Sequence, residues 1–119
     1  MKTVLWVSRH EMTADQFSDL ERVMGDKVHL LVFDDTVQDV SVLAPLLQQA
    51  DAAAVVMPLP LLAQMRRLTG DKPLLCAVSG RKPTGRMRQL DDGRQEKEFA
   101  FVHMGWEQIV RLELETKML

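Results

Sequence analysis

The chain has 119 residues, of which 46% are hydrophobic and 27% are charged, and its formal net charge at pH 7 is -2. This length and apolar content allow one domain to bury a core without disulfides or a structural metal, and the charge balance excludes both intrinsic disorder and nucleic-acid binding through bulk positive charge. We therefore expect a single domain over residues 1–119.

Cysteine usage and hydropathy indicate the compartment. Cys76 is the only cysteine and lies within an apolar run, which excludes disulfides and Cys-rich zinc sites and is typical of a reducing environment. No apolar stretch approaches the roughly 20 residues that cross a bilayer, and the N-terminus lacks the ordered regions of a signal peptide. The sequence thus predicts a cytoplasmic protein without a membrane segment.

Short apolar strands alternate with amphipathic helices over the first two thirds of the chain. Short apolar runs predict buried strands at Thr3–Val7, Val28–Phe33, Ala52–Met57 and Leu74–Val78. A helix is predicted after Thr13, which has capping-box spacing with Gln16, and Gly25 marks its end. Apolar residues at helical spacing predict two further helices, around Val40–Leu47 and Leu61–Leu68.

The alternation breaks after the fourth strand. Ser79–Arg86 contains two glycines, a proline and three cations, and is predicted to be a loop. Asp92 and Gly93 form a strong hairpin-turn dipeptide, so we expect a β-ribbon over about residues 86–102 that ends in a fifth strand at Phe99–Val102. A closing helix is expected from the spacing of Trp106, Ile109, Val110, Leu112 and Leu114.

These elements predict a three-layer, Rossmann-like α/β domain. Its five-stranded sheet should be mainly parallel, with helices on both faces and the ribbon before the last strand. Ligands of such sheets bind beyond the carboxyl ends of the strands. The segments expected at that edge are residues 8–10, 34–36, 57–58, 79–86 and 103–106.

The basic segment after the fourth strand carries groups that bind phosphate. Guanidinium forks, hydroxyls and backbone amides all donate hydrogen bonds to phosphate oxygens. The predicted ligand-binding residues are Ser79, Gly80, Arg81, Lys82, Thr84 and Arg86, joined by Ser8 and Arg9 after the first strand. A solvated basic loop is the alternative interpretation.

Two histidines and an acidic pair are further candidates. His10 could act as an acid, a base or a phosphate ligand, or only hydrogen-bond within its turn. His103 and Trp106 could bind a nucleobase at the rim, although Trp106 also has core spacing. Asp34 and Asp35 precede a helix as capping acids do, and we expect neither a metal nor another cofactor.

Residues Ser8 to Gln16 resemble the first strand-to-helix motif of small CRISPR-associated ring-nuclease candidates, relatives of the CARF ligand-sensing domains. His10, Met12, Thr13 and Gln16 match the motif, with Met12 in place of the usual leucine. The resemblance implies a homodimer that binds cyclic oligoadenylate, or another phosphate-bearing small molecule, over the strand carboxyl ends.

The same resemblance implies cleavage without a metal, in which a ribose 2′-OH attacks the adjacent phosphate. His10 would be the catalytic acid or base, and Arg9, Arg81 and Lys82 would hold the phosphates. A pure sensor would bind the ligand without cleaving it.

Two other functions remain open. Val7–Glu11 is similar to the Arg-His-Gly-Glu opening of histidine phosphatases, with Glu11 in place of the glycine, which would imply a phosphohydrolase. The non-enzymatic alternative is a protein-interaction or regulatory module of a mobile element, whose basic loop and ribbon bind a partner. A large apolar patch on the ribbon would favour a protein partner.

Overall fold

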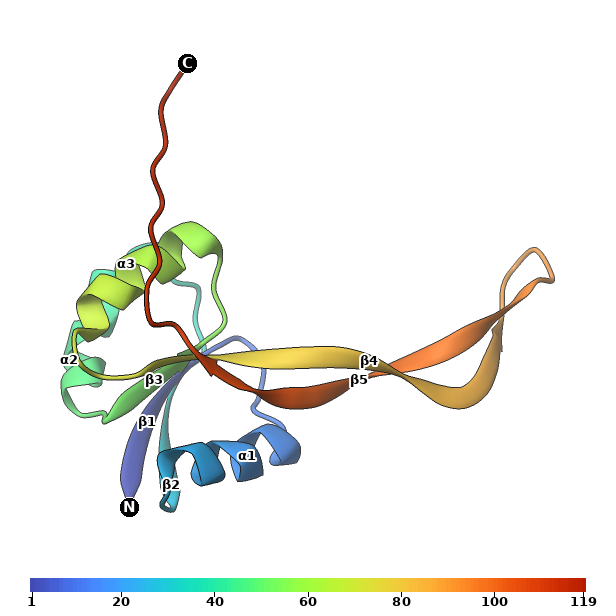
Figure 1. Ribbon diagram of the computed structural model, residues 1–119, viewed down its shortest axis with the longest axis horizontal. Helices are drawn as coiled ribbons and strands as arrows, with labels where there is room; N and C mark the ends of the chain where they lie inside the picture. The colour runs from blue at the N-terminus through green and yellow to red at the C-terminus, as the bar shows by residue number, and fades with distance from the viewer.

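A mixed five-stranded sheet covered by helices on both faces forms the body of the protein in the computed structural model, which describes residues 1–119 (Figure 1). The strands are β1 (Lys2–Val7), β2 (Val28–Phe33), β3 (Ala52–Val55), β4 (Leu74–Gln89) and β5 (Gln95–Gln108). The helices are α1 (Ala14–Met24), the 3₁₀ helix η1 (Val40–Leu43), α2 (Ala44–Gln48) and α3 (Leu59–Thr69). The predicted α/β class and Rossmann-like arrangement are confirmed.

The strand order β2-β1-β3-β4-β5 places one set of strand ends at a common edge. β1 pairs in parallel with β2 and β3, and β3 pairs in parallel with β4. Val7 lies opposite Phe33 in β2 and Val55 in β3, so these three strands end level with one another. The order reverses between β1 and β3, which makes their carboxyl ends the topological switch point.

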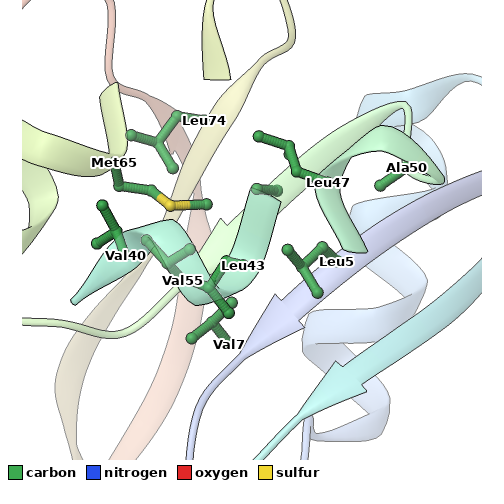
Figure 2. Close-up of a cluster of buried hydrophobic side chains, with 10 residues drawn as sticks. Leu5, Val7, Val40, Leu43, Leu47, Ala50, Val55, Met65 and Leu74 are labelled. Carbon is green, nitrogen blue, oxygen red and sulfur yellow. The ribbon is translucent and has the colours of Figure 1, made fainter. Parts of the chain in front are cut away.

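The central strands are buried on both faces. Alternate residues of β1 point to opposite sides of the sheet: Leu5 and Val7 pack under α2 and α3, whereas Val4 and Trp6 pack under α1. Figure 2 shows the first of these clusters, in which Leu43 of η1 and Met65 of α3 lie over the sheet residues Leu5, Val7 and Val55. This two-sided burial explains why the strands read as continuous apolar runs.

The first helix begins and ends where the sequence predicts. Thr13 Oγ1 accepts a hydrogen bond from the Gln16 amide at 3.1 Å, and Gln16 Oε1 accepts one from the Thr13 amide at 3.0 Å. Gly25, at φ 71°, ends the helix in the left-handed region, where glycine carries little steric cost. No helix has both the length and the apolar character that crossing a membrane requires.

Ser79–Arg86 is not a loop, which corrects the prediction. β4 continues through this segment to Gln89 and pairs antiparallel with β5 along its whole length, from Leu75 opposite Gln108 to Gln89 opposite Gln95. The expected ribbon and the expected fifth strand are therefore one hairpin, which projects well beyond the body in Figure 1. Its register shifts at Val78/Ser79 and again between Pro83 and Met87, where an irregularity tolerates a proline.

The expected closing helix is also absent, and Trp106 lies within β5. Residues 109–119 form neither helix nor strand, and the segment leaves the body beside α3 (Figure 1). Its first residues are anchored, because the Ile109 amide donates to the Leu74 carbonyl at 2.8 Å and Arg66 Nε donates to the Val110 carbonyl at 3.0 Å. From Val110 onward apolar and polar residues alternate, which is the period of a strand and not of a helix.

Candidate functional site

Ser8, Arg9 and His10 lie together at the carboxyl end of β1, as predicted. They line a hollow of about 480 Å³ that opens between the ends of β1 and β2. Trp6, Met12, Leu30 and Val32 give it an apolar floor, and its rim carries the His10 imidazole together with the charges of Arg9, Glu11 and Asp34. The hollow can therefore hold a small molecule with one apolar face and a charged end.

Two hydrogen bonds order the turn at this rim. The Ser8 hydroxyl oxygen accepts from the His10 amide at 3.0 Å, and Trp6 Nε1 donates to the His10 carbonyl at 3.0 Å. Ser8 is buried, whereas Arg9 and His10 are exposed. The backbone of His10 is thus fixed while its imidazole stays accessible, which suits a group that meets a ligand.

A second hollow lies on the other side of the same turn. It measures about 180 Å³ and is lined by Ser8 and Arg9 together with Asp35, Thr36, Met57, Pro58 and neighbouring apolar residues. It lies at the switch point between β1 and β3, where ligands of open α/β sheets bind. Asp35 Oδ1 accepts from the Thr36 amide at 2.7 Å, so this carboxylate orders its own turn. The acid that caps the next helix is Asp39, whose Oδ1 accepts from the Ser41 amide at 2.9 Å, and not Asp34 or Asp35 as expected.

The predicted phosphate clamp is divided between this edge and the ribbon. Neither hollow is lined by any of Ser79, Gly80, Arg81, Lys82, Thr84 and Arg86. The Thr84 hydroxyl donates to the Glu98 carbonyl and accepts from the Arg86 amide at 3.2 Å, so it serves the ribbon itself. Strand pairing carries these residues outward along β4, and His10 has no ribbon cation beside it in either hollow.

The ribbon instead exposes a patch of aromatic and basic side chains. Arg81 lies opposite Phe101 and Pro83 lies opposite Phe99, and side chains directly opposite or two apart share a face. Phe101 is 82% exposed and Phe99 is 42% exposed, and the Arg81 guanidinium lies 4.7 Å from the Phe99 ring centroid. We call Arg81, Met87, Lys97, Phe99 and Phe101 the ribbon patch.

Part of this patch lines a shallow hollow of about 190 Å³ on the ribbon, together with Arg88, Glu96 and Glu98. Sequence reasoning placed Phe99 and Phe101 in a strand but missed that they form a surface. The alternation of Phe99, Ala100 and Phe101 is a period-two signal that could have identified one aromatic face.

His103 and Trp106 anchor the base of the ribbon to α1, so they belong to the packed body and not to a ligand site. His103 Nε2 lies 2.8 Å from Asp19 Oδ2, and the His103 side chain is 7% exposed. Trp106 Nε1 donates to the Gln16 carbonyl at 3.0 Å, and the Trp106 ring meets Trp6 edge-on at 6.1 Å. Both residues therefore hold β5 against the helix.

Asp19 is the charged centre of this anchor. Its hydrogen bond from Arg22 Nε at 2.7 Å, followed by that from His103, lowers the pKa of the Asp19 carboxyl below its usual value. Asp19 is thus ionised at neutral pH and faces two donors. No group of three or more His, Cys, Asp or Glu side chains is arranged to hold a metal ion.

No family model, curated protein or solved structure matches the chain.

Proposed function

We propose that this chain is a non-enzymatic protein-interaction module whose β4–β5 ribbon binds a partner protein. One observation carries the proposal: Phe101 is 82% exposed and Phe99 is 42% exposed on a ribbon that extends past the folded body (Figure 1). A two-stranded ribbon is only marginally stable alone in water. A partner that covers one face of this ribbon would stabilise it and remove the aromatic side chains from solvent.

The chemistry of the ribbon fits a protein better than a nucleic acid. Aromatic residues, methionine and arginine are enriched at protein interfaces, and the ribbon patch contains all three. Acidic residues are interspersed along the same ribbon, where Glu96 pairs with Arg88 and Asp92 pairs with Arg94. The sequence pI is about 5.9, whereas a nucleic-acid-binding domain typically has a strongly basic footprint.

The patch is also partly organised before binding. Stacking of Arg81 over Phe99 limits the rotamers of both side chains, which lowers the ordering cost at an interface. His103, Phe101 and Phe99 alternate along β5 and so share a face, and His103 contacts α1. The ribbon patch is thus the outward continuation of the sheet face that α1 covers.

Photo-crosslinking from the ribbon itself tests the proposal, because the adduct forms with whichever polypeptide contacts that position. A photoreactive phenylalanine analogue replaces Phe101 in the chain expressed in its native host, and a matched chain carries it at Val23, which is also exposed but lies on α1. We expect a discrete, light-dependent adduct with a second polypeptide from position 101 and none from position 23. Absence of an adduct at position 101, or the same adducts from both positions, would contradict the proposal.

Substitution of the patch then measures its contribution. We expect Phe101→Ser to weaken binding of the captured protein by about 30-fold, because an aromatic interface anchor typically contributes 2 kcal/mol or more. Val42→Ser, at another exposed apolar residue, is the control and should leave the affinity unchanged. Equal affinities for wild type and Phe101→Ser would place the contact elsewhere.

The hollow beside His10 supports a second candidate function, the binding of a phosphate-bearing small molecule such as cyclic oligoadenylate. The supporting observation is the ordered turn that holds Ser8, Arg9 and His10 around one hollow at the strand carboxyl ends. Arg9 would contact phosphate, and His10 would bind or act as a metal-independent acid or base.

Calorimetry and chromatography with cyclic tetra- and hexa-adenylate in EDTA test this candidate. Arg9→Ala should weaken binding, whereas His10→Ala should slow any cleavage by about 10²- to 10⁴-fold while binding persists. Arg81→Ala with Lys82→Ala is the control, since neither residue lines the hollow. If wild type neither binds nor cleaves, the candidate fails while the ribbon proposal stands; turnover of p-nitrophenyl phosphate would instead indicate a phosphohydrolase.

For either function, we propose that the protein is located in the cytoplasm. The lone Cys76 is a free thiol in β4, and burial, with Glu107 nearby, raises the pKa of that thiol. A protonated, half-buried thiol without a disulfide partner is compatible with a reducing compartment.

A further inference from the structure

The C-terminal segment, residues 110–118, has the sequence of a strand but no strand to pair with. Every second residue is apolar or neutral, and the residues between are charged: Val110, Leu112, Leu114, Thr116 and Met118 alternate with Arg111, Glu113, Glu115 and Lys117. This is the pattern of a strand with one buried face. Yet Val110 is 70% exposed, Leu114 is 43% exposed and Met118 is 95% exposed, while Leu112 is half-buried, so most of the apolar face is uncovered.

β2 is an edge strand, and no neighbouring strand pairs with its outer side. The Lys2 amide donates to the Lys27 carbonyl and the Ser8 amide donates to the Phe33 carbonyl. Alternate residues of a strand face the same neighbour, so Leu30 and Val32, which fall between, turn their amides and carbonyls outward. No residue of β2 is acidic, Lys, Arg or Pro, and these are the residues that normally block an exposed edge.

The other edge of the sheet is protected in the usual ways. β5 carries Glu96, Lys97, Glu98 and Glu107, and its register with β4 shifts at two places. Charged side chains and bulges both discourage edge-to-edge pairing. Of the two edges, β2 is therefore the one open to an added strand.

We propose that residues 110–116 of one copy of this chain add as an antiparallel strand to β2 of a second copy, and that the exchange is reciprocal, giving a two-fold homodimer. Leu112 would lie opposite Val32 and Leu114 opposite Leu30, so that the outward amides of β2 find partners. The apolar face of the added strand would then extend the sheet face that α1 covers, since Val28 and Leu30 belong to the cluster under α1.

Charge complementarity selects this direction and register. Arg111 would lie at the end of β2, where Asp34 and Asp35 follow, and Glu115 would lie beside His29. The added strand would end near Thr116, opposite Val28, because the Val28 amide already donates to Glu21 Oε2 at 3.0 Å. The parallel direction would instead place Glu115 opposite Phe33, next to the two aspartates, and Arg111 beside His29.

A second copy is the occupant because the segment has no spare length to reach its own β2. Ile109 is fixed to β4 through the Leu74 carbonyl, and the strand pattern starts at the next residue. β4 and β2 are separated by β3 and β1, a distance of about 14 Å at the usual strand spacing. A two-fold exchange also adds each segment to an existing sheet, whereas two segments paired alone would form only an isolated two-stranded ribbon.

Analytical ultracentrifugation tests the proposal on the full chain. We expect a dimer at micromolar concentration for wild type, and a monomer for Leu112→Asp with Leu114→Asp, which places two carboxylates on the apolar face. The matched control is Val42→Asp with Leu59→Asp, the same chemical change at two exposed residues outside the proposed contact, and it should remain a dimer. A monomeric wild type, or a dimer that persists in the Leu112→Asp, Leu114→Asp chain, would overturn the proposal.

Val32→Pro approaches the same contact from the other strand. The proline removes an outward amide and leaves the hydrogen bonds to β1 intact, so this variant should also be monomeric while keeping its far-ultraviolet circular dichroism. Dimerisation of a folded Val32→Pro chain would exclude β2 as the docking edge.

A disulfide identifies the occupant directly. Opposite residues in a hydrogen-bonded antiparallel pair have the Cα separation that a disulfide requires. In a Cys76→Ser background, Val32→Cys with Leu112→Cys should give a covalent dimer on a non-reducing gel. A cross-link within one chain, or none, would overturn the proposal; the ribbon adduct at position 101 is measured separately, so the two proposals fail independently.

Discussion

At the scale of single residues, the most consequential contacts are the ones that fix the base of the ribbon. Trp106 and His103 come from β5, and each reaches a residue of α1, through the Gln16 carbonyl and the Asp19 carboxylate. His103 Nδ1 is buried without a partner, so only one nitrogen of the ring contributes a hydrogen bond. Asp19 is therefore the polar group that binds this side of β5 to the helix.

The pH dependence of stability should report this contact. Hydrogen bonds from Arg22 and then His103 hold the pKa of Asp19 below its usual value, and a carboxyl with a lower pKa in the folded state contributes stability that is lost as pH falls through that value. We expect wild type to lose stability more steeply than Asp19→Asn between about pH 5 and pH 2. Urea unfolding at several pH values measures the difference.

Asp15→Asn is the matched control for that series, because Asp15 lies in the first turn of the same helix and is exposed. Its profile should run parallel to that of wild type. A parallel profile for Asp19→Asn as well would show that the contact with His103 and Arg22 does not stabilise the fold in solution.

At the scale of elements, α1 forms from local signals and the ribbon from distant ones. The capping box at Thr13 and the left-handed Gly25 lie at the two ends of the helix, so its sequence specifies both limits. β4 and β5 form by pairing with each other, from Leu75 opposite Gln108 to Gln89 opposite Gln95. The two kinds of element should respond differently to substitution.

Removal of the N-cap should destabilise the protein measurably. We expect Thr13→Ala to lower the free energy of unfolding by about 1 kcal/mol, because the Gln16 amide loses its hydrogen-bond acceptor. Ser18→Ala, at an exposed position within the same helix, should be neutral or slightly stabilising, since alanine is the better helix former. Equal stabilities of the two variants in urea titrations would contradict the role of the cap.

The sequence allowed the first three strands, the start of the fourth, the three helical regions and the position of Ser8, Arg9 and His10 to be predicted, because each depends on a short stretch of chain. Ser79–Arg86 resembles a loop locally, with Gly80, Pro83 and Gly85 close together, and becomes a strand only through pairing with residues 99–103. The side chain of Met104 in β5 requires a glycine at position 80, because a Cβ there would lie 3.0 Å from it. For this reason the predicted phosphate-binding residues lie in two separate places, at the end of β1 and along the ribbon.

The C-terminal segment illustrates a different limit. Trp106, Ile109 and Val110 also fit helical spacing, and the helix expected there competes with a strand pattern that starts at Val110. Periodicity alone cannot separate the two over so few residues. In the structure Trp106 is held in β5 by its hydrogen bond to α1, and residues 109–119 form neither a helix nor a strand.

At the scale of the whole molecule, the chain is much more extended than its length requires. Its radius of gyration is 17.4 Å and its principal extents are 53 × 48 × 24 Å, whereas a compact domain of this length has a radius of gyration of about 13.5 Å. The ribbon and the C-terminal segment account for the excess, since both leave the body (Figure 1). Both also carry exposed apolar side chains, as expected of parts that are completed by partners.

Small-angle scattering measures this extension. The Leu112→Asp, Leu114→Asp chain, which is expected to be monomeric, should have a radius of gyration near 17.4 Å. Replacement of the distal ribbon, residues 84–98, by a two-residue Asn-Gly turn that joins the paired residues Pro83 and Phe99 should reduce that value. A radius of gyration close to 13.5 Å, the value for a compact domain, would show that the ribbon folds back onto the body.

Because the ribbon is held only at its base, a small tilt there corresponds to a large displacement of its tip. Residues 79–89 rise by about 35 Å in all, so a tilt of about 10° at the base would move the tip by about 6 Å. Few contacts hold this base: His103 contacts Asp19, and Trp106 contacts Gln16 and Trp6. Trp6 also donates from Nε1 to the His10 carbonyl, so this one side chain contacts both the base of the ribbon and the turn between β1 and α1.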